Sequence, residues 1–214
     1  MFLLLAGGDM KTGWIRRTGS HVPGCVGVLL FFPAAASAHL VSTGMGPVYD
    51  GIGHLLLTPE DLVPAIALSL YCGLRGPRAG RYAMFLLPLA WLLGGLVGLN
   101  LDLGVVIPVP ALSFLLLGGL IAADAKLPLP LIGPMTVAIG LLHGLLNGLV
   151  LKSGPGGPAL LGIMGALFVL VALLSAVVVS LERSWTRIVV RVMGSWVAAS
   201  GMLMIGWYYR GQLG

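Results

Sequence analysis

The feature that most constrains this chain is a series of long apolar segments joined by short polar connectors. Six such segments occupy residues 61–75, 82–98, 105–123, 130–151, 159–181 and 189–208. Each holds about 15 to 23 residues, close to what a helix rising about 1.5 Å per residue needs to cross about 30 Å of hydrocarbon. Only 9% of the residues are charged, against about 25% in soluble domains. A surface with so few charges is suited to lipid rather than to water.

Backbone groups inside lipid must find hydrogen-bond partners within the protein, so these segments must be helices rather than open strands. Short connectors also place successive helices side by side and antiparallel. We therefore predict an all-α fold, a polytopic membrane bundle of six transmembrane helices that forms a single domain over residues 39–214. The net charge of +5 could suggest nucleic acid. The basic residues lie beside the apolar segments, however, which is typical of topology determinants, and we predict the lipid bilayer and not nucleic acid as a partner.

Residues 1–38 have the pattern of a secretory signal peptide. A basic stretch ending at Arg17 precedes an apolar run over residues 22–33, and the small residues Ala36 and Ala38 follow. The apolar run is short for a membrane crossing, and small residues at these two positions favour cleavage. We expect cleavage between Ala38 and His39. The alternative is an uncleaved first transmembrane helix.

The distribution of basic residues predicts how the bundle is oriented. Those in or beside the odd-numbered connectors are Arg75, Arg78, Arg81, Lys126, Arg183, Arg187 and Arg191, whereas the opposite side has Lys152 and Arg210. Basic loops stay in the cytoplasm. We therefore expect a protein of the bacterial inner membrane, with both ends of the mature chain in the periplasm. Signal-peptide cleavage would also place the new N-terminus there.

Most of the remaining polar residues then lie towards the outer side. Those before or between the spans are His39, Asp50, His54, Glu60, Asp61 and Asp102. His143 falls in the outer half of the fourth span, and Asn147 lies four residues later, on the same helical face. Residues 39–61 are rich in glycine, which predicts an irregular strip in which Asp50 and His54 could share a short helical turn.

Ionisable residues within a span are costly and mark candidate functional sites. Imidazole and carboxylate groups together suit Ni, Cu, Zn or Co. We predict a metal site formed by His39, Asp50, His54 and His143, with Glu60, Asp61, Asp102 and Asn147 as secondary candidates. If cleavage exposes His39, its free amine and its ring could chelate one cation together.

Several of these residues also have a structural interpretation. Thr58 and the proline after it predict a helix start, at which Glu60 and Asp61 would cap the helix and face its dipole. Asp102 could be a solvated loop acid, and Asp124 could pair with Lys126. His143 could pack between helices on a neighbouring carbonyl group.

Two stretches of the chain resemble motifs of the HupE/UreJ family, small membrane proteins associated with hydrogenase and urease maturation and regarded as nickel permeases. HLLLTPED resembles the family pattern H-P-x-x-G-x-D-H, with His54 at the first histidine, Glu60 at the aspartate and Asp61 in place of the second histidine. LLHGLLNG resembles F-H-G-x-x-H-G, with His143 matching and Asn147 in place of the later histidine. The likeness extends from His39 to about residue 150. It implies a membrane bundle that handles nickel.

The leading prediction is therefore a permease for a transition-metal ion, nickel before copper, cobalt or zinc, captured at the outer face. The alternative is a membrane metallochaperone, or an assembly or structural subunit with a membrane or periplasmic partner, that binds metal such as copper without moving it. We predict no enzyme activity, because neither H-E-x-x-H nor G-x-S-x-G occurs, and no ATP-binding loop is present.

Overall fold

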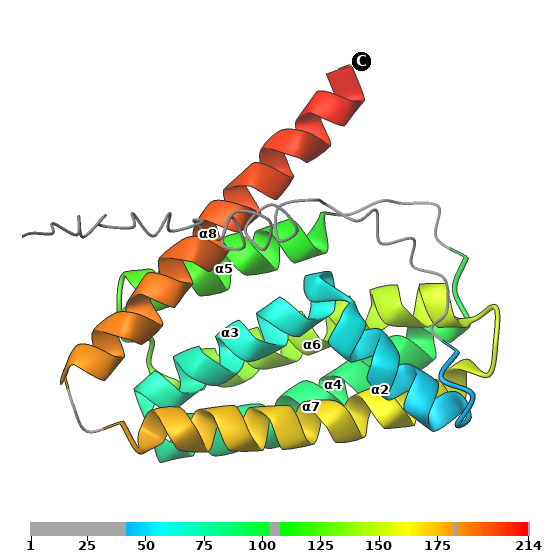
Figure 1. The fold of residues 1–214 in the computed structure, drawn as a ribbon, viewed down its shortest axis with the longest axis horizontal. Helices are drawn as coiled ribbons and strands as arrows, with labels where there is room; N and C mark the ends of the chain where they lie inside the picture. The colour runs from blue at the N-terminus through cyan, green and yellow to red at the C-terminus, as the bar shows by residue number, and fades with distance from the viewer. Residues whose placement is uncertain (1–41, 103–107, 182–183, 214) are drawn as a thin grey trace, which may run out of the picture. The chain divides into compact units, whose positions relative to one another are not determined.

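The computed structural model describes residues 42–102, 108–181 and 184–213, and all regular structure in these ranges is helical. The helices, shown in Figure 1, are α2 (Pro47–Leu57), α3 (Pro59–Arg75), α4 (Pro77–Leu99), α5 (Val109–Ala122), α6 (Leu129–Leu151), α7 (Gly156–Val179) and α8 (Ser184–Leu213). Helices α3 to α8 cover the six predicted segments, so the all-α prediction is confirmed for the described part of the chain. The predicted signal peptide and its cleavage site lie outside the described residues.

Four of these helices are long and apolar enough to cross a membrane, namely α4, α6, α7 and α8. Helices α2 and α3 pass the same test as a pair, bent by 76° at Thr58, so they could form one broken span. Helix α5 has only 14 residues, shorter than the 20 or so that a straight crossing needs. Four to five spans are therefore supported among the described residues, and six crossings stay a prediction.

The segment before α3 differs from its prediction. Helix α2 occupies Pro47–Leu57, where we expected a mostly irregular strip, and its first residue is a proline, which fits the first turn of a helix. At the start of α3, Pro59 takes the expected early position, but Thr58 makes no side-chain capping hydrogen bond. The predicted helix start is therefore confirmed, with Thr58 at the N-cap position but without the hydrogen bond of a capping side chain.

Small residues let α4 and α6 pack closely along their length. The Cβ that an alanine would add at Gly94 or Gly98 of α4 would lie 2.2 Å from a backbone oxygen of α6. Gly144 and Gly148 of α6 are equally tight, at 2.0 and 2.2 Å from backbone oxygens of α4. This close backbone approach is how helices associate where lipid supplies no hydrophobic driving force. It brings Trp91 of α4 against α6.

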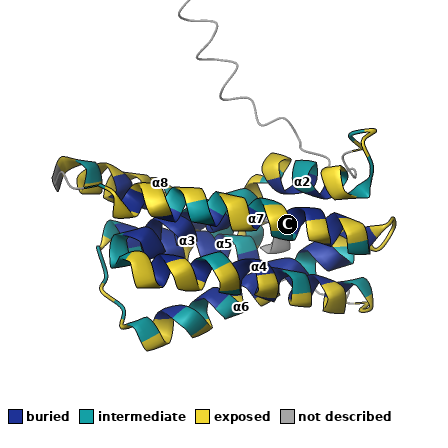
Figure 2. Ribbon diagram, turned by 90° about the horizontal axis from the view of Figure 1, so that it is seen from below, coloured by how far each residue is buried: buried dark blue, intermediate teal, exposed yellow. Residues whose placement is uncertain are grey.

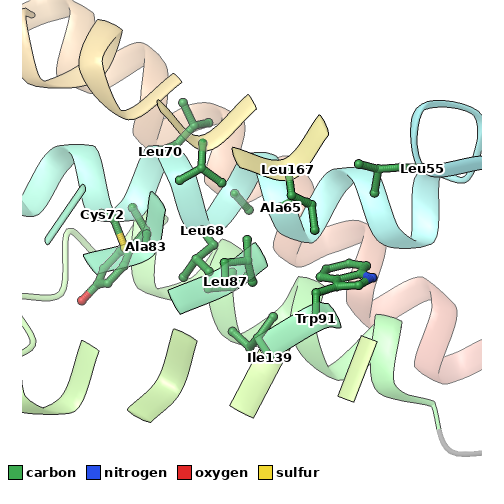
Figure 3. Packing of buried hydrophobic residues seen from close by; sticks show 14 of the residues in the cluster. Leu55, Ala65, Leu68, Leu70, Cys72, Ala83, Leu87, Trp91, Ile139 and Leu167 are labelled. Atoms are coloured by element: carbon green, nitrogen blue, oxygen red, sulfur yellow. The ribbon is translucent and has the colours of Figure 1, made fainter. Parts of the chain in front are cut away.

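Apolar side chains fill the interior and also cover the outside. Leu68, Leu87 and Ile139 lie together in the core, from α3, α4 and α6 (Figure 3). Large apolar side chains also face outwards, such as Trp196, Leu203 and Trp207 of α8, which are 74–78% exposed. Exposed faces run along the helices in Figure 2. A surface of this kind is what a helix presents to lipid.

Three of the basic residues predicted to share one side of the membrane, Arg75, Arg187 and Arg191, make contacts at the same end of α3, α5 and α8. Arg75 pairs with Asp124, so the predicted pairing of Asp124 with Lys126 is wrong. Arg187 and Arg191 of α8 donate to the carbonyl oxygens of Leu74 and Ala122. These contacts hold the ends of α3, α5 and α8 together. Which side of a bilayer this end faces stays a prediction.

The α4–α6 contact gives a direct test of the packing. In Gly148→Ala the new methyl group would press on the carbonyl oxygen of Gly95, so the two helices must separate. We expect the free energy of unfolding to fall by about 1–3 kcal/mol, the usual range for overpacking. The midpoint of thermal unfolding in detergent measures this effect.

Gly133→Ala, in the same helix, is the matched control. Its methyl group would meet only the Leu86 side chain, at an ordinary 3.8 Å. Alanine is also the better helix former, so this variant should be as stable as the wild type or slightly more stable. Equal destabilisation by the two substitutions would contradict close α4–α6 packing.

Candidate metal site

A connected set of polar side chains lies inside the bundle. Its members are Asp61 of α3, Ser113 of α5, and His143 and Asn147 of α6, and all are at most 6% exposed. His143 Nδ1 is 2.9 Å from Asp61 Oδ1, and His143 Nε2 is 3.0 Å from Ser113 Oγ. Asn147 Nδ2 donates to Asp61 Oδ2 at 2.7 Å. We call these four residues the buried polar cluster.

The local sequence explains how α6 contributes to this cluster. His143 and Asn147 are four residues apart and therefore lie on one face, as predicted. Gly144 is next to His143 and allows the α4 backbone to come close. The Trp91 ring of α4 then stacks on the His143 ring, with ring centroids 5.2 Å apart and planes 25° apart. The imidazole is fixed in position on three sides.

The hydrogen bonds assign the His143 proton. Both oxygens of the Asp61 carboxylate accept hydrogen bonds, Oδ2 from Asn147 and Oδ1 from the imidazole. A neutral imidazole has one N–H and one bare nitrogen. In that form the Asp61 carboxylate, which can only accept, places the proton on Nδ1 and leaves Nε2 to accept from the Ser113 hydroxyl. Metal-binding histidines have this arrangement, in which one ring nitrogen donates to a carboxylate and the other holds the metal.

Two buried polar atoms lack a hydrogen-bond partner, one in the buried polar cluster and one in the tryptophan that packs on it. They are Asn147 Oδ1, an acceptor, and Trp91 Nε1, a donor. A buried polar atom without a partner is costly, and such atoms call for an explanation, for example an ion that binds there. The free amide oxygen of Asn147 is a hard donor of the kind that coordinates cations.

The structure separates the predicted ligands into different groups. His54 is buried in α2, and the Asp61 carboxylate is close enough to act on it electrostatically. Asp50 instead accepts hydrogen bonds from the backbone and hydroxyl groups of Thr43, at 2.6 and 2.7 Å. His39 lies outside the described residues. No group of three or more His, Cys, Asp or Glu side chains that could hold a metal occurs in the described part of the chain.

The secondary candidates include both exposed and buried acids. Glu60 is exposed, which fits its predicted place at the helix start. Asp102 is exposed, as predicted for a loop acid, and its pairing with Lys152 holds the pKa of this carboxyl group below its usual range. Asp61 is in the first turn of α3, as expected, but its carboxylate is buried against His143 and Asn147. Asp61 therefore keeps its predicted position at the start of the helix and in addition links α3 to α6.

Sequence reasoning did not identify Ser113 and Trp91 as parts of the site. Ser113 is a single hydroxyl in an apolar helix, and Trp91 has no spacing relation to His143. Their roles depend on contacts between α6 and two other helices. The interpretation of His143 as bonded to a neighbouring carbonyl is also wrong, because both of its ring nitrogens meet side chains.

Apolar spans around a buried histidine–carboxylate pair define the protein as an α-helical integral membrane protein with an internal polar site. A family model described as HupE / UreJ protein matches residues 27–204, and the chain belongs to this family. The family is associated with the transport of nickel or other metals or with accessory functions, and it is not known as an enzyme family. No curated protein and no solved structure matches the chain.

The central place of Asp61 in the cluster leads to a stability prediction. Asp61→Ala would leave His143 Nδ1 and Asn147 Nδ2 buried without an acceptor. A buried unsatisfied group costs about 1–3 kcal/mol, so the midpoint of thermal unfolding in detergent should fall clearly. Glu60→Ala, the adjacent and exposed acid, is the matched control and should leave the midpoint unchanged. Similar midpoints for the two variants would show that the cluster does not hold α3 to α6.

Proposed function

We propose that this protein is a permease of the bacterial inner membrane for a transition-metal ion, with nickel as its cargo. The observation that carries the proposal is the pairing of His143 with Asp61 inside the helical unit. A histidine and a carboxylate are costly to bury in apolar surroundings, and this cost is understandable if the pair serves to bind an ion at the other ring nitrogen. Membership of a family associated with metal handling supports the same conclusion.

The chemistry of the cluster suits a borderline metal ion. Imidazole nitrogen is a preferred ligand of nickel, copper and zinc. In our proposal His143 Nε2 is the main donor and Asp61 orients the ring through Nδ1, while the free Asn147 Oδ1 is a separate oxygen donor on the Asp61 side of the ring. The positive charge of the ion would be balanced by the Asp61 carboxylate. Because these donors are few, binding would be weak, and a permeation path needs sites that release their ion.

We assign the remaining candidates to capture at the outer face. His39, Asp50 and His54 precede α3 in the chain, and the Asp61 carboxylate acts electrostatically on His54. In this proposal the ion is bound first by these residues and then passes to Asp61 and His143. Glu60 is exposed beside Asp61 and would attract cations to the entrance. Asp102 has no ligand role here, because Lys152 already neutralises it.

One experiment distinguishes transport of the ion across the membrane from binding of the ion without transport. Purified protein is reconstituted in liposomes that contain a nickel-sensitive dye, and Ni²⁺ is added outside. Uptake by the wild type supports the permease. Binding of Ni²⁺ to the protein without uptake would contradict the permease and favour a metallochaperone or an assembly subunit.

His143→Gln tests the assigned donor. Glutamine keeps a polar side chain of similar length but has no imidazole nitrogen, so we expect Ni²⁺ uptake to fall by about tenfold or more. Asp102→Asn is the control and should transport at the wild-type rate. Thermal unfolding in detergent must show that both variants are folded. Unchanged uptake by folded His143→Gln would remove the proposed role of this residue.

A further inference from the structure

The bare nitrogen of His143 is covered by a hydroxyl group. In the neutral imidazole that donates from Nδ1 to Asp61, the lone pair of Nε2 is the one available to a metal, and it accepts the hydrogen bond from Ser113, whose Oγ is 3.0 Å away. A cation and the Ser113 proton cannot use this lone pair together. The hydrogen bond must therefore break before Nε2 can bind an ion.

The imidazole itself has little freedom to turn away from Ser113. Its ring stacks on Trp91, which is 1% exposed, and its other nitrogen is bonded to Asp61. Asp61 is in turn held by Asn147. Rotation of the ring would break the bond to Asp61 and disturb the stacking. The movable partner is the hydroxyl group of Ser113, which can swing about a single side-chain bond.

The surroundings of Ser113 leave room for this movement. Helix α5 packs mainly on α8 and α3, and it meets α6 at few points. A groove of about 230 Å³ separates α5 from α6 beside Ser113. Its walls include Leu112, Ser113 and Leu116 from α5 and Met135, Ile139 and Leu142 from α6.

We infer that Ser113 is a positioning residue that covers the metal-binding nitrogen of His143 and is displaced by the ion. This inference rests on the proposed function. Without an ion, the hydroxyl group donates a hydrogen bond to Nε2 and keeps the ring in the orientation that binds metal. When an ion binds, it must replace this hydrogen bond, so its net affinity falls. The same hydrogen bond forms again as the ion leaves and assists release.

Ser113→Ala should therefore bind metal more tightly than the wild type. Loss of one competing hydrogen bond should raise the affinity for the metal about three- to tenfold. Titration of purified protein in detergent with Ni²⁺ alone measures the dissociation constant. In liposomes the variant should show a lower KM and also a lower maximal rate, because release becomes slower. A ligand role for Ser113 predicts weaker binding instead, and a purely structural role predicts no change, so either result would overturn the inference.

Two further variants separate this effect from general damage. Ser113→Thr keeps the hydroxyl group and should restore wild-type affinity. Ser175→Ala in α7 is the matched control, because Ser175 is also 6% exposed but bonds within its own helix. It should leave the affinity for Ni²⁺ unchanged. Tightening of binding by Ser175→Ala to the same degree would contradict the inference.

A measurement without metal tests the hydrogen bond itself. Nitrogen-15 spectra of histidine-labelled protein, with the His143 signals assigned through His143→Gln, report the state of each ring nitrogen. In Ser113→Ala the Nε2 signal should move towards that of an unbonded bare nitrogen, while Nδ1 stays protonated. No change at Nε2 would overturn the inference. If this shift occurs but the wild type binds no Ni²⁺, the proposed function fails and only the hydrogen-bond geometry remains.

Discussion

The carboxylate of Asp61 lies among apolar helices, and the interior of the bundle is organised around its need for hydrogen-bond donors. Two donors reach it, the imidazole of His143 and the amide of Asn147, and both come from α6. A charge in such a place is tolerated only when it is paired and hydrogen-bonded. Asp61 therefore links α3 to α6, two helices that otherwise touch at few points. The same bonds fix which nitrogen of His143 is free.

The close packing of α4 on α6 complements this polar link. Glycines of the two helices let their backbones meet. The backbone oxygen of Trp91 lies so close to Gly144 that any larger residue at position 144 would collide with it. The Trp91 ring then lies flat on His143. The imidazole is thus held by an apolar surface on its face and by polar groups at its edge. A site held in this way needs little rearrangement to accept an ion, apart from the movement of Ser113 that we infer.

Helices α3 to α8 could be predicted from the sequence, but α2 and the contacts between the helices could not. Apolar runs reflect the thickness of a membrane, so the positions of α3 to α8 could be read from them. The spacing of His143 and Asn147 gave their shared face, because a helix fixes neighbours four residues apart. The partnership of Asp61 with His143 spans 82 positions in the chain, and no local pattern carries such a contact. For the same reason Ser113 and Trp91 were missed, and Asp124 was paired with a neighbour in sequence instead of Arg75.

The most direct test of the account is to locate nickel in crystals of the full protein. Anomalous scattering measured at the nickel absorption edge, after Ni²⁺ has been soaked in, shows where the ion binds. We expect a peak at a bonding distance of about 2 Å from His143 Nε2, with the Ser113 hydroxyl turned away. A fully occupied nickel site confined to the surface near Asp50 and His54, with none at His143, would contradict it.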